Sequence, residues 1–162
     1  MAKVVLICGK ICSGKSYYAS KLKGDMNAVA FSCDELMKDI FPYDLDRRHD
    51  GITSRVKLYL HRKASEVAKA GTNVVLDFGF WSNKEREEVS DFYTSQNIRF
   101  EWHYIDISDE DWATNIRERN KQVTEGLSKD YYIDDGLLSK MNSLFEKPSK
   151  QEMTVWYINR RL

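Results

Sequence analysis

Short runs of apolar, mostly β-branched residues recur along the chain and predict β-strands. The runs cover Lys3 to Cys8, Ala28 to Phe31, Asn73 to Leu76, Ile98 to Ile105 and Thr154 to Ile158. Apolar residues at consecutive positions are typical of strands that are buried on both faces, as in a parallel sheet. We therefore expect five strands, of which the fourth alternates more than the others between apolar and polar residues.

Amphipathic patterns with helical periodicity lie between these runs. The clearest covers Ile52 to Ala70, where an apolar residue recurs every three or four positions and Gly71 stands at the C-terminal cap position. Ser82 and Ser108 are placed to cap the starts of two further helices, because acidic residues follow each serine within one turn. A fourth helical pattern runs from Asp134 to Glu146.

The alternation of strands and helices predicts an α/β domain with a parallel sheet that is covered by helices on both faces. A chain of 162 residues is expected to form one such domain. In these sheets ligands bind where strands end and the following helices begin, so functional residues are expected in the strand-to-helix turns. The polar stretch from Lys121 to Tyr132 lacks a periodic pattern and is expected to be mobile.

Composition narrows the classes of function. The chain has 25 Lys and Arg residues against 25 Asp and Glu residues, so it has no overall field that would attract a polyanion. The longest apolar run, Val4 to Cys8, is too short to cross a bilayer. Three cysteines without a Cys-x-x-Cys pair indicate neither a disulfide framework nor a zinc site. These features predict a cytoplasmic protein with no membrane partner.

The turn after the first predicted strand carries the most specific motif in the chain. It reads Gly9-Lys10-Ile11-Cys12-Ser13-Gly14-Lys15-Ser16 and matches the phosphate-binding pattern G-x-x-x-x-G-K-[ST] between a strand and a helix. The glycines let consecutive backbone N–H groups curl around a phosphate at the positive end of the next helix. Lys15 is expected to reach the β- and γ-phosphates of a nucleotide, and the Ser16 hydroxyl to bind Mg²⁺.

Asp34 follows the second predicted strand, and it is therefore expected at the same edge of the sheet as the phosphate loop. A carboxylate at this place can accept the proton of a hydroxyl group while that group attacks the γ-phosphate. The alternative is that Asp34 caps the helix that follows. A role as general base is the leading hypothesis for this residue.

Asp77 follows the third apolar run. An acidic residue at the end of such a strand typically positions Mg²⁺ or its bound water beside the nucleotide. Ser16 and Asp77 together are therefore the candidate metal site. The alternative is that Asp77 only caps the end of the strand.

The helix that begins at Ser108 ends in a basic segment before the polar stretch. Arginines on such a segment can close over a triphosphate and neutralise the charge that develops during phosphoryl transfer. Arg117 and Arg119 are the candidates, in a lid from about residue 117 to 133. The alternative is a solvated helix end without a catalytic role.

With the segments GKICSGKS, SCDE, VVLDFGFW, RERN and LFEKPSKQE, the chain resembles the small P-loop kinases of the AAA_33 type. That group includes chloramphenicol phosphotransferases, zeta toxins and polynucleotide kinases. The resemblance spans nearly the whole chain. It implies a three-layer P-loop NTPase sandwich with strand order 2-3-1-4-5 that uses ATP and Mg²⁺.

The same resemblance implies roles for individual residues. It makes Asp34 the general base and puts Arg117 and Arg119 in the lid, with Arg119 also contacting the nucleotide. It places the segment from Pro148 to Glu152 near the adenine. We also expect the nucleotide contacts of the phosphate loop to continue to Tyr17, although the family usually has Thr at this position.

Aromatic and basic groups near the second and third predicted strands are candidates for an acceptor pocket. They are Tyr43, Arg47, Arg48, Phe80, Trp81 and Arg86, together with the two carboxylates Asp34 and Asp77. Aromatic faces and charged groups can orient a small molecule. The alternative is that the aromatic and basic residues belong to a surface loop and to the core.

The chemistry of the acceptor separates the hypotheses for function. An acceptor that already carries a phosphate would need several arginines around it and no general base. Asp34 therefore favours an ATP-dependent phosphotransferase that acts on a hydroxyl of a small metabolite, nucleotide-sugar or antibiotic. A polynucleotide 5′-hydroxyl kinase is the second hypothesis, and a non-catalytic nucleotide-dependent switch or binding module is the third. The identity of the acceptor and the choice between monomer and homodimer stay open.

Overall fold

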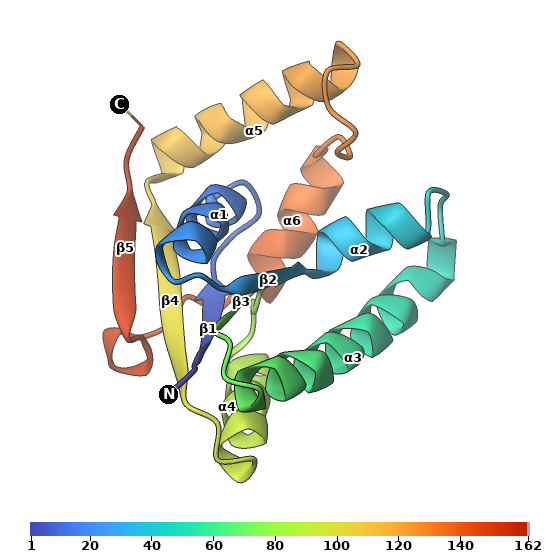
Figure 1. The fold of residues 1–162 in the computed structure, drawn as a ribbon. Helices are drawn as coiled ribbons and strands as arrows, with labels where there is room; N and C mark the ends of the chain where they lie inside the picture. The colour runs from blue at the N-terminus through green and yellow to red at the C-terminus, as the bar shows by residue number, and fades with distance from the viewer. Residues whose placement is uncertain (162) are drawn as a thin grey trace.

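The computed structural model describes residues 1–161 and has one parallel sheet between layers of helices (Figure 1). Its strands are β1 (Val4–Cys8), β2 (Val29–Ser32), β3 (Val74–Gly79), β4 (Phe100–Ile107) and β5 (Val155–Asn159). Its α-helices are α1 (Lys15–Asp25), α2 (Cys33–Ile40), α3 (His49–Lys69), α4 (Asn83–Ser95), α5 (Asp109–Thr124) and α6 (Asp135–Leu144). Short 3₁₀ turns cover Asp46–Arg48 and Lys150–Glu152.

The five strands run parallel in the order β2-β3-β1-β4-β5, which confirms the predicted α/β class and strand order. The third strand differs from the prediction because it continues past Leu76 to Gly79. Asp77 ends the apolar run, yet it still pairs with Ile7 of β1, and Gly79 pairs with Cys8 after a register shift. Backbone pairing with the central strand thus extends β3 beyond the point where its hydrophobic pattern stops.

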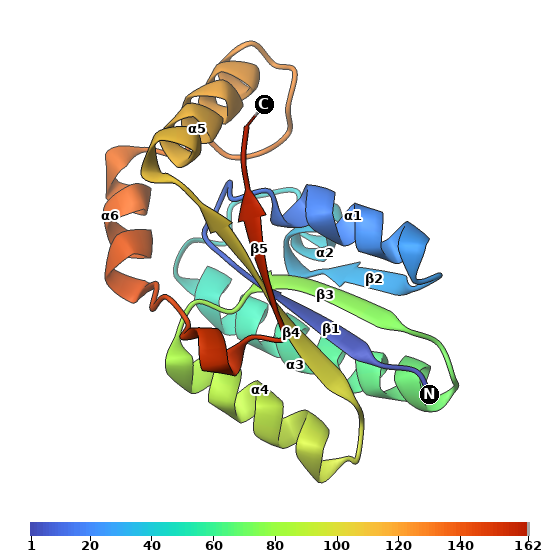
Figure 2. The same cartoon turned by 90° about the vertical axis from the view of Figure 1, so that its left-hand side faces the viewer.

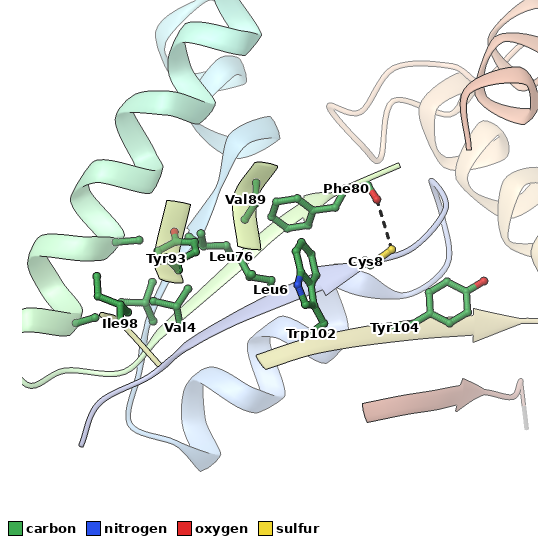
Figure 3. Packing of buried hydrophobic residues seen from close by; sticks show 13 residues of the cluster. Val4, Leu6, Cys8, Leu76, Phe80, Val89, Tyr93, Ile98, Trp102 and Tyr104 are labelled. Atoms are coloured by element: carbon green, nitrogen blue, oxygen red, sulfur yellow. Dashed lines mark hydrogen bonds between the residues drawn. The ribbon is translucent and has the colours of Figure 1, made fainter. Parts of the chain in front are cut away.

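Side chains of the central strand β1 point alternately to two helical layers, as the two-residue period of a strand requires. Val4, Leu6 and Cys8 pack into a cluster with residues of α3 and α4. Figure 3 shows this cluster, in which the Cys8 thiol donates a hydrogen bond to the carbonyl of Phe80. The side chains between them, Val5 and Ile7, pack against α1 on the opposite face of the sheet. Figure 2 shows α1 on one side of the strands and α3 and α4 on the other.

Side-chain caps mark the helix starts that the sequence predicts. The Ser82 hydroxyl accepts a hydrogen bond from the backbone N–H of Glu85 at 3.1 Å, and the Ser108 hydroxyl accepts one from Asp111 at 3.1 Å. The Asp134 carboxylate accepts one from the N–H of Leu137 at 2.8 Å. These caps satisfy backbone donors that the helices leave unpaired, and so they fix where each helix begins.

The helices α5 and α6 enclose a separate apolar cluster beside the phosphate loop. Its buried members are Ile11, Ile116, Ile133 and Met141. The connection between the two helices is held at its end, because the Asn120 side chain donates to the carbonyl of Ile133 at 2.8 Å and accepts from its N–H at 2.7 Å. The polar stretch from Lys121 to Tyr132 is therefore anchored at its end by the buried Ile133 and by the Asn120 amide. Within residues 1–161, no helix is both long enough and apolar enough to span a membrane.

A buried histidine lies behind β3. His61 of α3 packs against the rings of Phe78, Phe80 and Phe92, and its Nδ1 shares a hydrogen bond of 2.8 Å with the Tyr93 hydroxyl. Burial, with a smaller contribution from the positive charge of Lys57, lowers the pKa of His61 to about 4. The imidazole is therefore neutral in the folded protein at pH values where it would already be protonated in the unfolded chain.

We expect the free energy of unfolding to fall as the pH decreases from about 6.5 toward 4, because unfolded His61 takes up a proton that the folded state excludes. Between pH 7 and pH 5 this effect amounts to roughly 2 kcal/mol. His61→Gln lacks this effect. The free energy of unfolding of the natural protein minus that of the variant should therefore decrease by that amount from pH 7 to pH 5, as measured by urea unfolding at each pH. A difference that does not vary with pH would show that His61 is not the group responsible.

Candidate functional site

A cleft of about 890 Å³ opens beside the phosphate loop at the carboxyl edge of the sheet. Its walls come from the phosphate loop, the first turn of α2, the end of β3, and from α3, α5 and α6. Lys15, Ser16, Asp34 and Asp77 all line it. The structure therefore brings together the phosphate loop, the candidate metal site and the candidate general base in one cavity.

The phosphate loop needs left-handed backbone conformations. Cys12 has φ 57° and Gly14 has φ 95°. At Gly14 a Cβ atom would lie 2.5 Å from the side-chain nitrogen of Asn159, so both the backbone conformation and the available space require glycine. Gly14 is also the N-cap residue of α1 and has no side chain to occupy the first turn of this helix. The N–H groups of that turn stay open toward the cleft, where they can bind a phosphate.

The carbonyl groups of three consecutive loop residues, Ile11 to Ser13, each accept a hydrogen bond from a side chain outside the loop. The donors are Trp112 Nε1 at 2.7 Å, Asn115 Nδ2 at 2.9 Å and Asn159 Nδ2 at 2.8 Å. In a peptide unit the N–H and the C=O point in opposite directions. Because these carbonyls are held toward α5 and β5, the N–H groups of the same peptide units point away from α5 and β5. Two helix side chains and one strand side chain thus stabilise the curled shape of the loop.

The residues of the loop do not all face the cleft. Ile11, Cys12 and Gly14 line it, as do Lys15, Ser16 and Tyr17. Lys15 Nζ donates to the carbonyl of Lys10 at 2.6 Å, within the loop itself.

Three residues of the loop, Gly9, Lys10 and Ser13, do not line the cleft. Lys10 lies over the Trp112 ring, 4.4 Å from its centre, and forms an ion pair with Asp109. Ser13 is fully buried, and a Cβ atom at Gly9 would lie 2.8 Å from its hydroxyl oxygen. Gly9 and Ser13 therefore shape the loop, and the Lys10 side chain is directed toward α5.

The two residues of the candidate metal site lie in direct contact. The Ser16 hydroxyl donates to Asp77 Oδ2 at 3.1 Å. Burial raises the pKa of Asp77, while the charge of Lys15 and the Ser16 hydrogen bond act in the opposite direction. Mg²⁺ in phosphate-binding sites takes only one or two protein oxygens and completes its shell with phosphate and water. A hydroxyl and a carboxylate in direct contact fit that requirement. Within residues 1–161, no cluster of three or more His, Cys, Asp or Glu side chains offers a metal site made of protein ligands alone.

Asp34 does not cap α2, so the capping alternative is wrong. The cap is Ser32, whose hydroxyl accepts from the N–H of Glu35 at 3.2 Å. Asp34 lies in the first turn of α2 with an exposed side chain that lines the cleft. Together with burial, its negative charge raises the pKa of Tyr131, and it also contributes to the raised pKa of Asp77. The carboxylate thus lies among the other polar groups of the cleft, where it is open to a ligand.

The two candidate arginines of α5 point to different places. The Arg119 guanidinium lines the cleft, stacks 4.5 Å from the centre of the Tyr131 ring and lies 3.5 Å from Cys12 Sγ. Arg117 is exposed, donates to the Thr114 hydroxyl at 2.9 Å and borders a separate surface pocket. Only Arg119 is therefore placed to act on a ligand at the phosphate loop.

The segment predicted as a lid is helical up to Thr124 and then forms the loop that leads to α6. Asp130 in this loop forms ion pairs with Lys38 of α2 and, at 3.8 Å, with Arg119. Although burial opposes it, the Lys38 hydrogen bond and the charge of Arg119 lower the pKa of Asp130. The loop thus connects α5 to α2 beside the cleft. Its opening and closing stay a prediction.

Of the six aromatic and basic residues proposed for the acceptor pocket, the cleft contains only Trp81. Tyr43, Arg47 and Arg48 are exposed on the connection between α2 and α3, and they lie outside the cleft. Phe80 is fully buried in the cluster under α3 and α4. For Phe80 the core alternative is therefore confirmed, and its positive φ of 48° lies at the turn that follows β3.

Arg86 is also a correction, because it is 2% exposed and holds the scaffold together. Its guanidinium donates to the carbonyl of Phe80 at 2.9 Å and to that of Glu146 at 3.0 Å, and it lies 3.7 Å from the Glu152 carboxylate. These bonds tie α4 to the connection between α6 and β5. A buried charge with this many partners is committed to the fold and is unavailable to an acceptor.

The segment from Pro148 to Glu152 does not reach the cleft either. Pro148 is buried, and Glu152 pairs with Arg86 in the 3₁₀ turn before β5. Figure 2 shows this turn and α5 at opposite ends of β5. The contacts of this segment therefore give no support to its expected place near the adenine. The residues that follow the other end of β5 lie beside α5, where Arg161 Nη2 donates to Glu118 at 2.6 Å.

Several residues of the cleft carried no recognisable motif in the sequence. Thr53, Ser54 and Lys57 line it from one face of α3, and Leu137 and Lys140 line it from α6. The spacing of three and four residues on α3 does indicate a shared helix face. Only the packing of α3 and α6 shows that these faces border the cleft.

Comparisons with known proteins agree with this architecture. The family model AAA_33, described as an AAA domain, matches residues 4–148. Among solved structures, the fold is similar to an APS kinase, CysC, from Mycobacterium tuberculosis, with TM-score 0.69 and 16% identity over 99% of this chain and 90% of that one. It is also similar to Kti12 from Chaetomium thermophilum, with TM-score 0.71 and 13% identity over 96% and 88% of the two chains. A gluconokinase from Sinorhizobium meliloti 1021 has TM-score 0.62 and 14% identity over 96% and 82%.

No curated protein matches the chain. At these identities the solved structures show a common fold and no more. The family match covers most of the chain, including β1, the phosphate loop and every helix from α1 to α6. The chain therefore belongs to the AAA_33 family and has the fold of the P-loop NTPases.

Proposed function

We propose that the protein is an ATP-dependent phosphotransferase that moves the γ-phosphate to a hydroxyl group of a small molecule. One observation carries this proposal. The Asp34 carboxylate, which is free of a capping role, lines the same cleft as the phosphate loop and the pair formed by Ser16 and Asp77. A site that only bound a nucleotide would have no chemical need for this carboxylate.

The residues divide the reaction between them. Backbone N–H groups from Gly14 to Ser16 would hold the β-phosphate, and Lys15 would leave the carbonyl of Lys10 to contact the β- and γ-phosphates. Asp34 would accept the proton of the acceptor hydroxyl as its oxygen forms a bond to the γ-phosphorus. The bond from this phosphorus to the oxygen that bridges the β- and γ-phosphates breaks, and ADP leaves with the electron pair. Arg119 would neutralise charge on the phosphoryl group during transfer.

Ser16 and Asp77 would hold a magnesium ion, which when bound neutralises charge on the β- and γ-phosphates. Without the ion, Lys15 is the cation that acts most strongly on the Asp77 carboxylate. A metal in this position would keep Asp77 ionised despite its burial.

The names of the similar structures support the same class of reaction. Two of the three are kinases by title, and the APS kinase was solved with AMPPNP and APS. Kti12 was solved with ADP-AlF3. Because these chains share only the fold with this one, the phosphate donor is transferred here as a proposal, and the acceptor is not transferred at all.

The other two hypotheses have less support. A polynucleotide kinase needs a cationic groove along a strand of nucleic acid, yet Arg86 is buried and Arg47 and Arg48 lie outside the cleft. A non-catalytic switch would bind ATP in the same loop, so only the behaviour of Asp34 separates it from an enzyme.

The role of Asp34 can be tested by Asp34→Asn. We expect phosphoryl transfer to fall by roughly 10²- to 10⁴-fold, because the amide cannot accept the proton, while ATP affinity changes by only a few fold. Lys15→Ala should reduce both phosphoryl transfer and ATP affinity. Transfer is followed with γ-labelled ATP, and affinity by titration calorimetry. Glu35→Gln changes a neighbouring exposed carboxylate outside the cleft and should behave like the natural protein. Full transfer by Asp34→Asn would refute its role as general base.

The two arginines of α5 provide a matched pair. Arg119→Ala should reduce the single-turnover rate of transfer by roughly a hundredfold or more, because charge that develops on the phosphoryl group loses its partner. Arg117→Ala removes an exposed guanidinium on the same helix and should leave this rate within about twofold. Circular dichroism checks that both variants keep the helix. Equal losses in the two variants would contradict the assignment of Arg119.

A further inference from the structure

The part of the cleft beyond the phosphate loop is built by two helices that face each other. Asp50, Thr53 and Lys57 lie at helical spacing on α3, and Leu137 and Lys140 lie at helical spacing on α6. Lys140 Nζ is 4.0 Å from the Asp50 carboxylate, so an ion pair bridges the two helices. We call this part, between α3 and α6, the acceptor end of the cleft.

Positive charge at the acceptor end is neutralised within the protein. Lys57 Nζ donates to Glu85 Oε1 at 2.8 Å, and both side chains line the cleft with 28% of their surface exposed. Lys140 has Asp50 as its partner. Within residues 1–161, the only arginine that lines the cleft is Arg119, which belongs to the nucleotide end and lies 3.8 Å from Asp130.

Glu85, Asp50 and Glu118 each have a cationic partner, and Asp77 is committed to Ser16 and the metal position. Within residues 1–161, the unbalanced carboxylate of the cleft is therefore that of Asp34. A phosphate, sulfate or carboxylate on the acceptor would lie in the same cleft as this carboxylate, where each lysine between α3 and α6 already has a carboxylate partner. Recognition of such anions normally uses charge-assisted or bidentate hydrogen bonds from those side chains. Like charges in a partly buried site also disfavour binding.

The uncharged groups of the acceptor end suit a molecule that has both hydroxyl groups and an apolar face. Ser54 Oγ donates to the carbonyl of Asp50 at 2.9 Å and can still accept a hydrogen bond from a ligand. Phe78, Trp81 and Leu137 add apolar surface to the same walls. The Trp81 indole packs closely against Gly79, since a Cβ atom at Gly79 would lie 2.9 Å from Trp81 Nε1. The C–H face of a sugar or cyclitol ring packs well against aromatic surface of this kind.

We propose that the acceptor is a non-anionic, polyhydroxylated small molecule with the chemistry of a sugar, cyclitol or nucleoside, and that Glu85 determines this preference by neutralising Lys57. This inference rests on the proposed phosphotransferase function and narrows it. Nucleotide-sugars, sugar phosphates, sugar acids and nucleic acids are excluded as preferred acceptors, because each would bring negative charge to Asp34.

The first experiment separates acceptors by charge. A deproteinised small-molecule cell extract is divided on an anion exchanger, and each fraction is incubated with the protein, γ-labelled ATP and Mg²⁺. Matched pairs are tested alongside: glucose with gluconate and glucose 6-phosphate, adenosine with AMP, and a 5′-hydroxyl oligonucleotide. We expect label in products from the unretained fraction, and kcat/KM at least about tenfold higher for the uncharged member of any pair that reacts.

The outcomes distinguish this inference from the function on which it rests. Preferred labelling of the retained fraction, of an anionic member or of the oligonucleotide would overturn the inference and leave the phosphotransferase standing. If no fraction and no compound takes label although ATP binds in a Lys15-dependent manner, the phosphotransferase itself is refuted.

A specificity variant tests Glu85 directly. Glu85→Gln leaves Lys57 without its carboxylate partner, so the ratio of kcat/KM for an anionic acceptor to that for its uncharged counterpart should rise about tenfold. The ATP KM should stay unchanged. Glu88→Gln breaks the pair with Lys84 on the same helix but outside the cleft, and it should not move the ratio. If the ratio is the same in Glu85→Gln and the natural protein, Glu85 does not determine acceptor charge, and the assignment fails.

Discussion

The phosphate loop keeps its shape because side chains from distant parts of the chain hold its carbonyl groups. Trp112 and Asn115 come from α5, and Asn159 is the last residue of β5. Each replaces a hydrogen bond that a tight turn would otherwise leave to water, and together they hold the loop in its curled shape, in which the Ser13 N–H donates to the carbonyl of Lys10 at 3.2 Å. The loop is thus largely organised before any phosphate arrives, so a bound phosphate does not have to supply the free energy of ordering it.

Because the phosphate loop depends on side chains of α5 and β5, these elements must themselves be held in place. The Ser108 cap sets the start of α5, and Ile116 of this helix packs against Ile11 of the loop. On the other side, buried Arg86 ties α4 to the connection that leads from α6 to β5. Movement of α5 or β5 would disturb the loop directly. The loop between α5 and α6 belongs to the same network of contacts, because Ile133 packs with Ile11 and the Asn120 side chain holds its backbone.

Local patterns predict the fold of this chain well, and they also single out the phosphate loop and the two residues, Ser16 and Asp77, that meet beside it. Strands buried on both faces have continuous apolar runs, and serine or aspartate caps mark helix starts, so both leave signals within a few residues. Ser16 and Asp77 meet because the first and third strands are neighbours in this sheet order. Phe80 and Arg86 are different, since an aromatic or basic residue after a strand carries no local sign of whether it faces the cleft or the core. In the structure both side chains are buried and do not face the cleft.

The sequence by itself determined the family, the α/β architecture, the place of the phosphate loop and the candidate role of Asp34, because each depends on residue types at fixed short spacings. Only the tertiary structure decided that Arg119 and not Arg117 reaches the cleft, since their spacing turns the two side chains to different sides of α5. It also decided that the acceptor end consists of α3 and α6 with its lysines already paired. These contacts join residues far apart in the chain, and their charge balance exists only after the helices pack.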